Sequence, residues 1–105
     1  MGRAAYGPRV DVFDVLGDPV RRRLLELLAG AERSAGALGS VVQAEFGITQ
    51  PAVSQHLRVL RETGFVRVRP AGTARLYAAD PERLREADEW VTGLRSRVRQ
   101  RDLDR

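Results

Sequence analysis

Apolar residues recur every three or four positions along most of the chain, which is the spacing of one face of an α-helix. Helix starts are marked by Asp18-Pro19 and Asp80-Pro81, because aspartate caps the first turn and proline fits the first helical position. Ser34 and Thr49 are similar caps. The pattern predicts about five helices, over residues 10–16, 19–30, 35–46, 50–63 and 81–100.

Valine and arginine alternate after the fourth predicted helix, and a period of two is typical of a β-strand. Residues 66–69 and 74–78 are predicted to be two short strands. Residues 70–73 are predicted to form the loop between them, with Gly72 in a turn position. The chain, 105 residues long, has room for one domain, so the expected fold is mainly α with one β-hairpin over residues 1–105.

The helix predicted over residues 50–63 has two chemically different faces. At about 100° per residue, Val53, Leu57 and Leu60 fall in a narrow apolar stripe. The other face carries amide, hydroxyl and guanidinium groups, which are the groups that contact base edges and phosphates in a major groove. These polar residues are Gln50, Ser54, Gln55, Arg58 and Arg61.

Positive charge is concentrated in the same part of the chain. The formal net charge is +4, and residues 50–79 hold five arginines against one acid, Glu62. An excess confined to one stretch is typical of a surface that meets phosphates. Arg69 and Arg75 flank the expected hairpin tip and are predicted to contact the DNA backbone. The alternative is that both are solvated edge-strand arginines that hinder aggregation.

The order of these parts narrows the fold. A helix, a turn at Gly47, the two-faced helix and then a hairpin is the layout of a winged helix-turn-helix domain. In that layout the second helix enters the major groove, and the hairpin, or wing, reaches the flanking backbone or minor groove.

Three stretches resemble the arsenical-resistance repressor (ArsR) family: LGDPVRRRLL at 16–25, TQPAVSQHL at 49–57 and LRETGFV at 60–66. The likeness covers roughly residues 12–90. It implies a homodimeric repressor whose recognition helix contacts operator DNA. Together with the charge pattern, it predicts DNA contacts at Thr49, Gln50, Pro51, Ser54, Gln55, Arg58, Arg69 and Arg75.

The chain also departs from the family pattern. Metal-sensing members often carry a Cys-x-Cys pair before the recognition helix, or Asp and His ligands on the last helix. This chain has no cysteine, and its one histidine, His56, lies on the packed side of the recognition helix, where we expect it to bond to backbone. The resemblance therefore implies a metal-independent, autorepressor-like branch with no metal and no cofactor. The stretch between Ser34 and Thr49 is also longer than in typical members.

The last predicted helix carries the spacing of a helix pair. A core this small should be filled by the first four helices, so we expect this stripe, with the first helix, to form a homodimer interface. Packing onto the chain's own core is the alternative, and Trp90 could instead line an effector pocket. The predicted interface residues are Val12, Phe13, Leu16, Leu84, Ala87, Trp90, Val91, Leu94 and Val98.

Several classes of protein are not favoured. Ser54 and His56 point apart on their helix, and no Gly-rich phosphate loop or paired acids suggest an enzyme. No apolar run approaches the roughly 18 residues of a membrane span, and the N-terminus does not resemble a signal peptide. Without cysteine, the cytoplasm is the expected compartment.

The sequence thus predicts a cytoplasmic, non-enzymatic repressor that binds a pseudo-palindromic operator as a homodimer. Two other hypotheses stay open. One is a ligand- or metal-responsive sensor that uses only oxygen ligands. The other is a winged-helix module for protein–protein contact, against which the charge excess over residues 50–79 argues.

Overall fold

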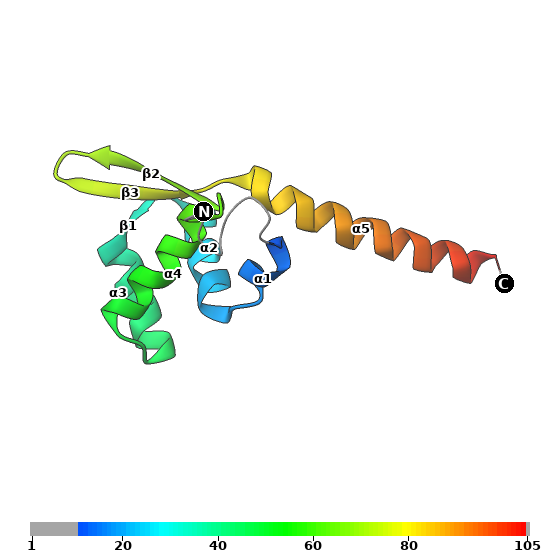
Figure 1. Ribbon diagram of the computed structural model, residues 1–105, viewed down its shortest axis with the longest axis horizontal. Helices are drawn as coiled ribbons and strands as arrows, with labels where there is room; N and C mark the ends of the chain where they lie inside the picture. The colour runs from blue at the N-terminus through cyan, green and yellow to red at the C-terminus, as the bar shows by residue number, and fades with distance from the viewer. Residues whose placement is uncertain (1–10, 105) are drawn as a thin grey trace, which may run out of the picture.

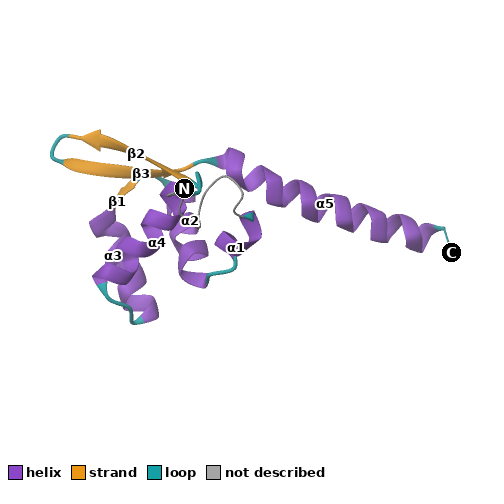
Figure 2. Cartoon of the chain, viewed as in Figure 1, coloured by secondary structure: helices purple, strands orange, loops and turns teal. Residues whose placement is uncertain are grey.

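The computed structural model describes residues 11–104 of the chain. Within this range the fold is mainly helical with a small antiparallel sheet, as predicted (Figures 1 and 2). The elements in chain order are α1 (Val12–Leu16), α2 (Pro19–Gly30), β1 (Arg33–Ser34), α3 (Ala35–Phe46), α4 (Gln50–Glu62), β2 (Val66–Ala71), β3 (Ala74–Ala79) and α5 (Pro81–Leu103).

The helices begin at the predicted caps. The side chains of Asp18, Ser34, Thr49 and Asp80 each accept a hydrogen bond from a backbone N–H of the first turn. Helix α1 is capped in the same way by Asp11, so it starts later than predicted; residue 10 lies outside the described residues. The long stretch before the recognition helix folds as the single helix α3.

Glycine ends α3 and closes the turn after α4. Gly47 follows α3 with a φ of 66°, and Gly64 follows α4 with a φ of 84°. Side chains with a Cβ rarely adopt this left-handed region, so glycine allows the chain to turn at both points without strain. The first turn connects α3 to α4, and the second connects α4 to the wing.

The sheet contains a strand that the sequence pattern did not predict. The short strand β1 pairs with β3, and the order is β1-β3-β2. The wing strands are also longer than predicted. Pro70 and Ala71 pair with β3 instead of joining the loop, which leaves Gly72 and Thr73 as a two-residue turn. Proline is tolerated because β2 is an edge strand.

The core lies where the first four helices meet the base of the wing. Val53, Leu57 and Leu60, the predicted stripe of α4, are at most 2% exposed and pack within it. Their packing partners come from all four of the remaining helices, α1, α2, α3 and α5, and from the start of β2. The buried cluster is Val12, Val15, Val20, Leu24, Leu25, Leu28, Leu38, Val42, Val53, Leu57, Leu60, Phe65, Val66 and Ala87.

Helix α5 extends away from this core. In Figure 1 the wing and α5 project in opposite directions from the body formed by α1–α4. The molecule measures 60 × 36 × 26 Å, with a radius of gyration of 16.5 Å. A compact domain of this length would have a radius of about 13 Å. Ala87 is the buried residue of α5, so most of this helix has no packing partner within the described part of the chain.

Arg21 and Arg22 hold the end of α1. Arg22 is exposed to solvent, whereas Arg21 is partly buried. The Arg21 Nε donates to the Val15 carbonyl at 2.9 Å, and the Arg22 guanidinium donates to the Leu16 carbonyl at 2.7 Å. Both therefore satisfy carbonyls that the last turn of α1 leaves without helical partners.

Arg23 joins α2 to α3. Its guanidinium donates to both carboxylate oxygens of Glu45, at 2.8 and 3.0 Å, and approaches Glu26 at 3.3 Å. The hydrogen bonds from Arg23 lower the pKa of Glu45 below its ordinary value. Glu26 thus forms an ion pair with Arg23, whereas Glu32, at the end of the same segment, pairs with Arg69 of the wing.

Candidate nucleic-acid interface

The outward face of α4 is polar and exposed. The predicted contact residues on this helix and its cap are all exposed to solvent: Thr49, Gln50, Pro51, Ser54, Gln55 and Arg58. The opposite face is anchored in the core, so the polar face is held outward. Side chains able to donate and accept hydrogen bonds thus project from a rigid helix, as reading base edges requires.

Gln50, at the start of α4, is held by a side chain of α3. The Gln43 Nε2 donates to the Gln50 Oε1 at 2.8 Å. The pair lies over Gly39, where a Cβ would come within 2.8 Å of that Oε1. Gly39 therefore lets the two amides approach the helix backbone.

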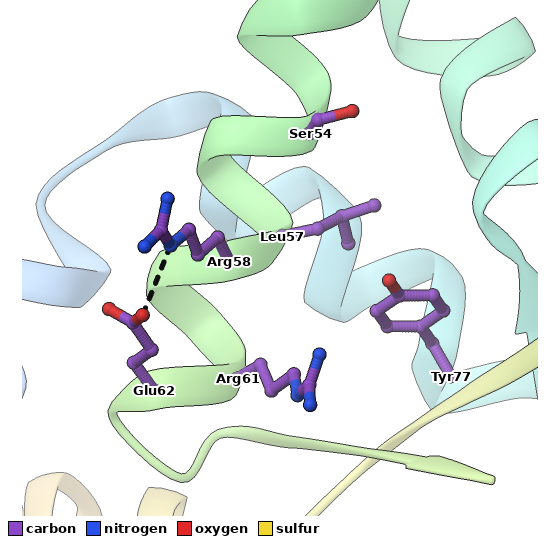
Figure 3. A pocket seen from close by; sticks show the side chains of 6 residues that line it. All are labelled: Ser54, Leu57, Arg58, Arg61, Glu62 and Tyr77. Carbon is purple, nitrogen blue, oxygen red and sulfur yellow. Dashed lines mark hydrogen bonds and ion pairs between the residues drawn. The ribbon is translucent and has the colours of Figure 1, made fainter.

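Arg58 and Arg61 have different surroundings, although both lie on α4. The Arg58 Nε donates to Glu62 at 3.1 Å, one helical turn away. Arg61 is exposed and has no hydrogen bond or ion pair among residues 11–104. Figure 3 shows Leu57 and Arg61 directed toward Tyr77 of β3, while Arg58 turns toward Glu62.

These side chains line a cleft of about 430 Å³ between α4 and the wing. Its residues are Ser54, Leu57, Arg58, Arg61, Glu62 and Tyr77. The cleft joins α4 to the wing, and Arg61 supplies a cation that has no ion-pair partner in the described part of the chain. The sequence pattern placed Arg61 on the polar face of α4 but did not predict Tyr77, whose place beside α4 depends on the sheet.

The two wing arginines predicted to contact DNA also differ. The guanidinium of Arg69 donates to both oxygens of Glu32, at distances of 2.8 to 3.3 Å. Glu32 precedes β1, so the unpredicted strand brings it to the wing. Arg75 is exposed and is without an ion pair in the described range. A phosphate contact by Arg69 stays a prediction, and it requires exchange of Glu32 for phosphate.

The Glu32–Arg69 pair changes the pKa of Glu32, which can be measured. Hydrogen bonds from Arg69 hold the pKa of Glu32 below its ordinary value. The pair therefore stabilises the fold above the ordinary glutamate pKa, and this contribution is lost as pH falls through the lowered pKa. Because both side chains are exposed, we expect the effect on stability to be small.

Arg69→Gln should return the Glu32 pKa to its ordinary range, since the charged donor is removed. A carbon-13 NMR titration of the glutamate carboxyls measures this change. Glu45 is the internal control, because its pKa is lowered by Arg23 and should stay low in the variant. An unchanged Glu32 pKa in Arg69→Gln would show that the pair does not form in solution.

His56 was predicted to bond to backbone, but within residues 11–104 its ring contacts side chains instead. Its Nδ1 lies 3.4 Å from the Arg21 guanidinium and 3.9 Å from the Asp18 carboxylate. The ring thus packs α4 against the start of α2.

Across residues 11–104, no group of three or more His, Cys, Asp or Glu side chains is placed to hold a metal ion. The same range contains no helix with the length and apolarity of a membrane span.

The predicted dimer residues divide into two groups. Val12 and Ala87 are at most 9% exposed and belong to the chain's own core, and Leu16 is partly buried against it. Val12 of α1 and Ala87 of α5 are therefore not free to contact a partner, because both face the core. The exposed group is Phe13, Leu84, Trp90, Val91, Leu94 and Val98.

Two of the exposed residues meet across α1 and α5. The rings of Phe13 and Trp90 stack edge to face, with centroids 5.3 Å apart. Trp90 remains 55% exposed. The aromatic pair extends the apolar stripe of α5 onto α1, so the exposed surface is continuous over both helices.

Comparison with known proteins connects this geometry to a family. A model of a helix-turn-helix domain family matches residues 16–69. The chain is 40% identical over 72 residues to the HTH-type transcriptional regulator Rv2034 of Mycobacterium tuberculosis, covering 69% of this chain and 64% of that protein. It is 28% identical over 81 residues to the transcriptional repressor SdpR of Bacillus subtilis, covering 77% and 86%.

Solved structures agree with these relatives. A protein described as a possible transcriptional regulator for arsenical resistance superposes with a TM-score of 0.68 at 36% identity, covering 81% of this chain and 84% of that one. The homodimeric winged helix-turn-helix DNA-binding domain of Mb0332 from Mycobacterium bovis, a possible ArsR-family regulator, gives 0.60 at 26% identity, covering 81% and 75%. The predicted family and fold are confirmed.

Proposed function

Because the chain belongs to the ArsR family of winged helix-turn-helix transcriptional regulators, we propose that it is a repressor that binds a pseudo-palindromic operator as a homodimer. The observation that carries the proposal is the outward polar face of α4 beside a wing with exposed arginine. In this proposal α4 lies in the major groove, Arg61 and Arg75 neutralise phosphates, and the amides of α4 distinguish bases.

The homodimer part of the proposal is supported by the apolar surface of α5 and α1. Leu84, Trp90, Val91, Leu94 and Val98 are each 37% or more exposed along one side of a projecting helix. A second copy of the chain can cover this stripe by helix pairing, and the similar Mb0332 domain is homodimeric. Two-fold symmetry would then place two recognition helices about 34 Å apart, one helical turn of DNA.

The proposal includes neither a metal effector nor a catalytic activity. The whole sequence holds no cysteine and one histidine, and these are the side chains that zinc and similar metals prefer. In this proposal the chain acts as a single DNA-binding domain, with residues 81–100 as the dimerisation helix. Because it binds operator DNA, we expect it in the cytoplasm. We expect zinc salts or a chelator to leave its affinity for DNA unchanged.

The roles of α4 and the wing can be separated by two substitutions. Gln50→Ala should cost about 1–3 kcal/mol of specific binding and spare non-specific binding, because it removes a base contact. Arg75→Ala should weaken binding to every duplex and reduce the salt slope by about 0.9, the value for one phosphate. Fluorescence anisotropy on a site selected from random duplexes and on a scrambled duplex, at several salt concentrations, measures both.

Arg97→Ala on α5 is the matched control for Arg75→Ala, because it removes the same charge far from the wing. It should leave both the affinity and the salt slope near the wild-type values. Equal losses on selected and scrambled DNA for Gln50→Ala would contradict its role in base reading. If the wild type enriches no sequence from the random pool, the proposed function is wrong.

A further inference from the structure

The amide pair between α3 and α4 restricts what Gln50 can offer to a base. A glutamine side chain has one carbonyl acceptor and one amino donor group. In the structure the Gln50 Oε1 accepts a hydrogen bond from the Gln43 Nε2 at 2.8 Å and is turned toward α3, above Gly39. The Gln50 amino group has no such partner within residues 11–104 and remains available on the exposed face of α4.

The surroundings of the pair keep it in place. Gln43 is half-buried on α3, and Gly39 one turn earlier is buried. A Cβ at position 39 would lie 2.8 Å from the Gln50 Oε1 and 3.3 Å from the Gln43 Nε2. Glycine in the interior of a helix is unfavourable, but here it provides the space into which the two amides pack.

The consequence follows from the pattern of groups in the major groove. Adenine presents an acceptor and a donor, so a glutamine that reads it in two hydrogen bonds needs both its oxygen and its nitrogen. Guanine presents two neighbouring acceptors, N7 and O6, which an amino group alone can contact. With its oxygen held by Gln43, Gln50 is matched to guanine and not to adenine.

We propose that Gln43 is a positioning residue that makes Gln50 select guanine at its place in the operator. The inference rests on the proposed function, since it requires that Gln50 faces a base. Gln43 itself need not touch DNA. It acts by orienting the amide of Gln50, and Gly39 makes that orientation possible.

The test uses base preference rather than affinity as its readout. Sites are selected from a pool of random duplexes by the full chain, and the position read by Gln50 is identified as the one whose preference disappears in Gln50→Ala. Gln43→Glu, Gln43→Leu and Gly39→Ala are then selected on the same pool. Circular dichroism melting verifies that each variant is folded.

Gln43→Glu is the most informative variant, because a carboxylate can only accept. It should turn the Gln50 amide around, so that the amino group faces Glu and the oxygen faces the groove. The preference at that position should change by about tenfold or more, from guanine to a base with an amino donor, adenine or cytosine. Gln43→Leu and Gly39→Ala should release Gln50 and remove the preference for guanine over adenine.

Ser40→Glu is the charge control. Ser40 is exposed on α3 and forms no hydrogen bond with Gln50 within residues 11–104, so an added carboxylate there should weaken binding to all sequences without changing the preferred base. Identical base profiles for wild type, Gln43→Glu and Gln43→Leu would overturn the inference and leave the proposed function intact. A wild type that selects no motif overturns both.

Discussion

Replacing Leu94 with aspartate is expected to convert the proposed dimer into monomers and to weaken binding to a duplex with two half-sites by about 100-fold or more. Leu94 lies within the apolar stripe of α5, with Val91 and Val98 one turn away on either side. Burying a carboxylate in that stripe without a partner is costly. The monomer then loses the high effective concentration that the first bound half-site gives to the second.

Sedimentation equilibrium at micromolar concentration and fluorescence anisotropy on the two-half-site duplex measure the two effects. Ser96→Asp is the matched control, because Ser96 is exposed on the opposite side of the same helix. It adds the same charge and should leave both the dimer and the affinity intact. A wild type that is monomeric, or a Leu94→Asp variant that remains a dimer, would contradict the proposed interface.

Replacing Phe65 with alanine is expected to lower the free energy of unfolding by about 3–5 kcal/mol. A domain of this kind has a total stability of about 5–15 kcal/mol, so the variant should lose a large fraction of it. Phe65 has no exposed surface and is among the largest fully buried side chains of the described residues. Its ring is also covered by the Arg83 guanidinium at 5.4 Å.

The backbone of Phe65 explains why DNA binding should fail with the fold. Its N–H donates to Leu60 at the end of α4, and its carbonyl accepts from the Asp80 N–H at the start of α5, both at 2.8 Å. The residue therefore connects α4, the wing and α5. Losing its side chain should loosen all three.

Urea unfolding followed by circular dichroism measures the loss. Phe46→Ala is the matched control, because the same side chain at 38% exposure leaves no internal cavity when it is truncated. We expect it to cost much less than Phe65→Ala. Equal losses in the two variants would mean that Phe65 is not part of the stabilising core.

Much of the fold could be predicted because its signals are local. Asp18-Pro19 and Asp80-Pro81 start helices through contacts within three residues, so their effect does not depend on the rest of the molecule. The two faces of α4 follow in the same way from helical periodicity. The order of helix, turn, helix and hairpin was then sufficient to predict the winged helix-turn-helix fold and the exposed polar face of α4.

The contacts that periodicity could not predict join residues distant in the sequence. Strand β1 is too short to carry an alternating pattern, so its pairing with β3, and with it the Glu32–Arg69 pair, could not be expected. The carbonyl contacts of Arg21 and Arg22 likewise depend on how α1 packs against α2. Charge spacing along one helix does not reveal such partners.

Periodicity along the chain therefore determined the helices and the inward and outward faces of α4, because these depend on neighbouring residues. The family was predicted from the resemblance of three short stretches of sequence. Tertiary packing alone decided which exposed groups remain available. It turned Val12 and Ala87 into the core, left Leu94 and Trp90 exposed, and placed Gln43 against Gln50. These outcomes depend on distances between elements, which are set only when the helices pack around a shared core.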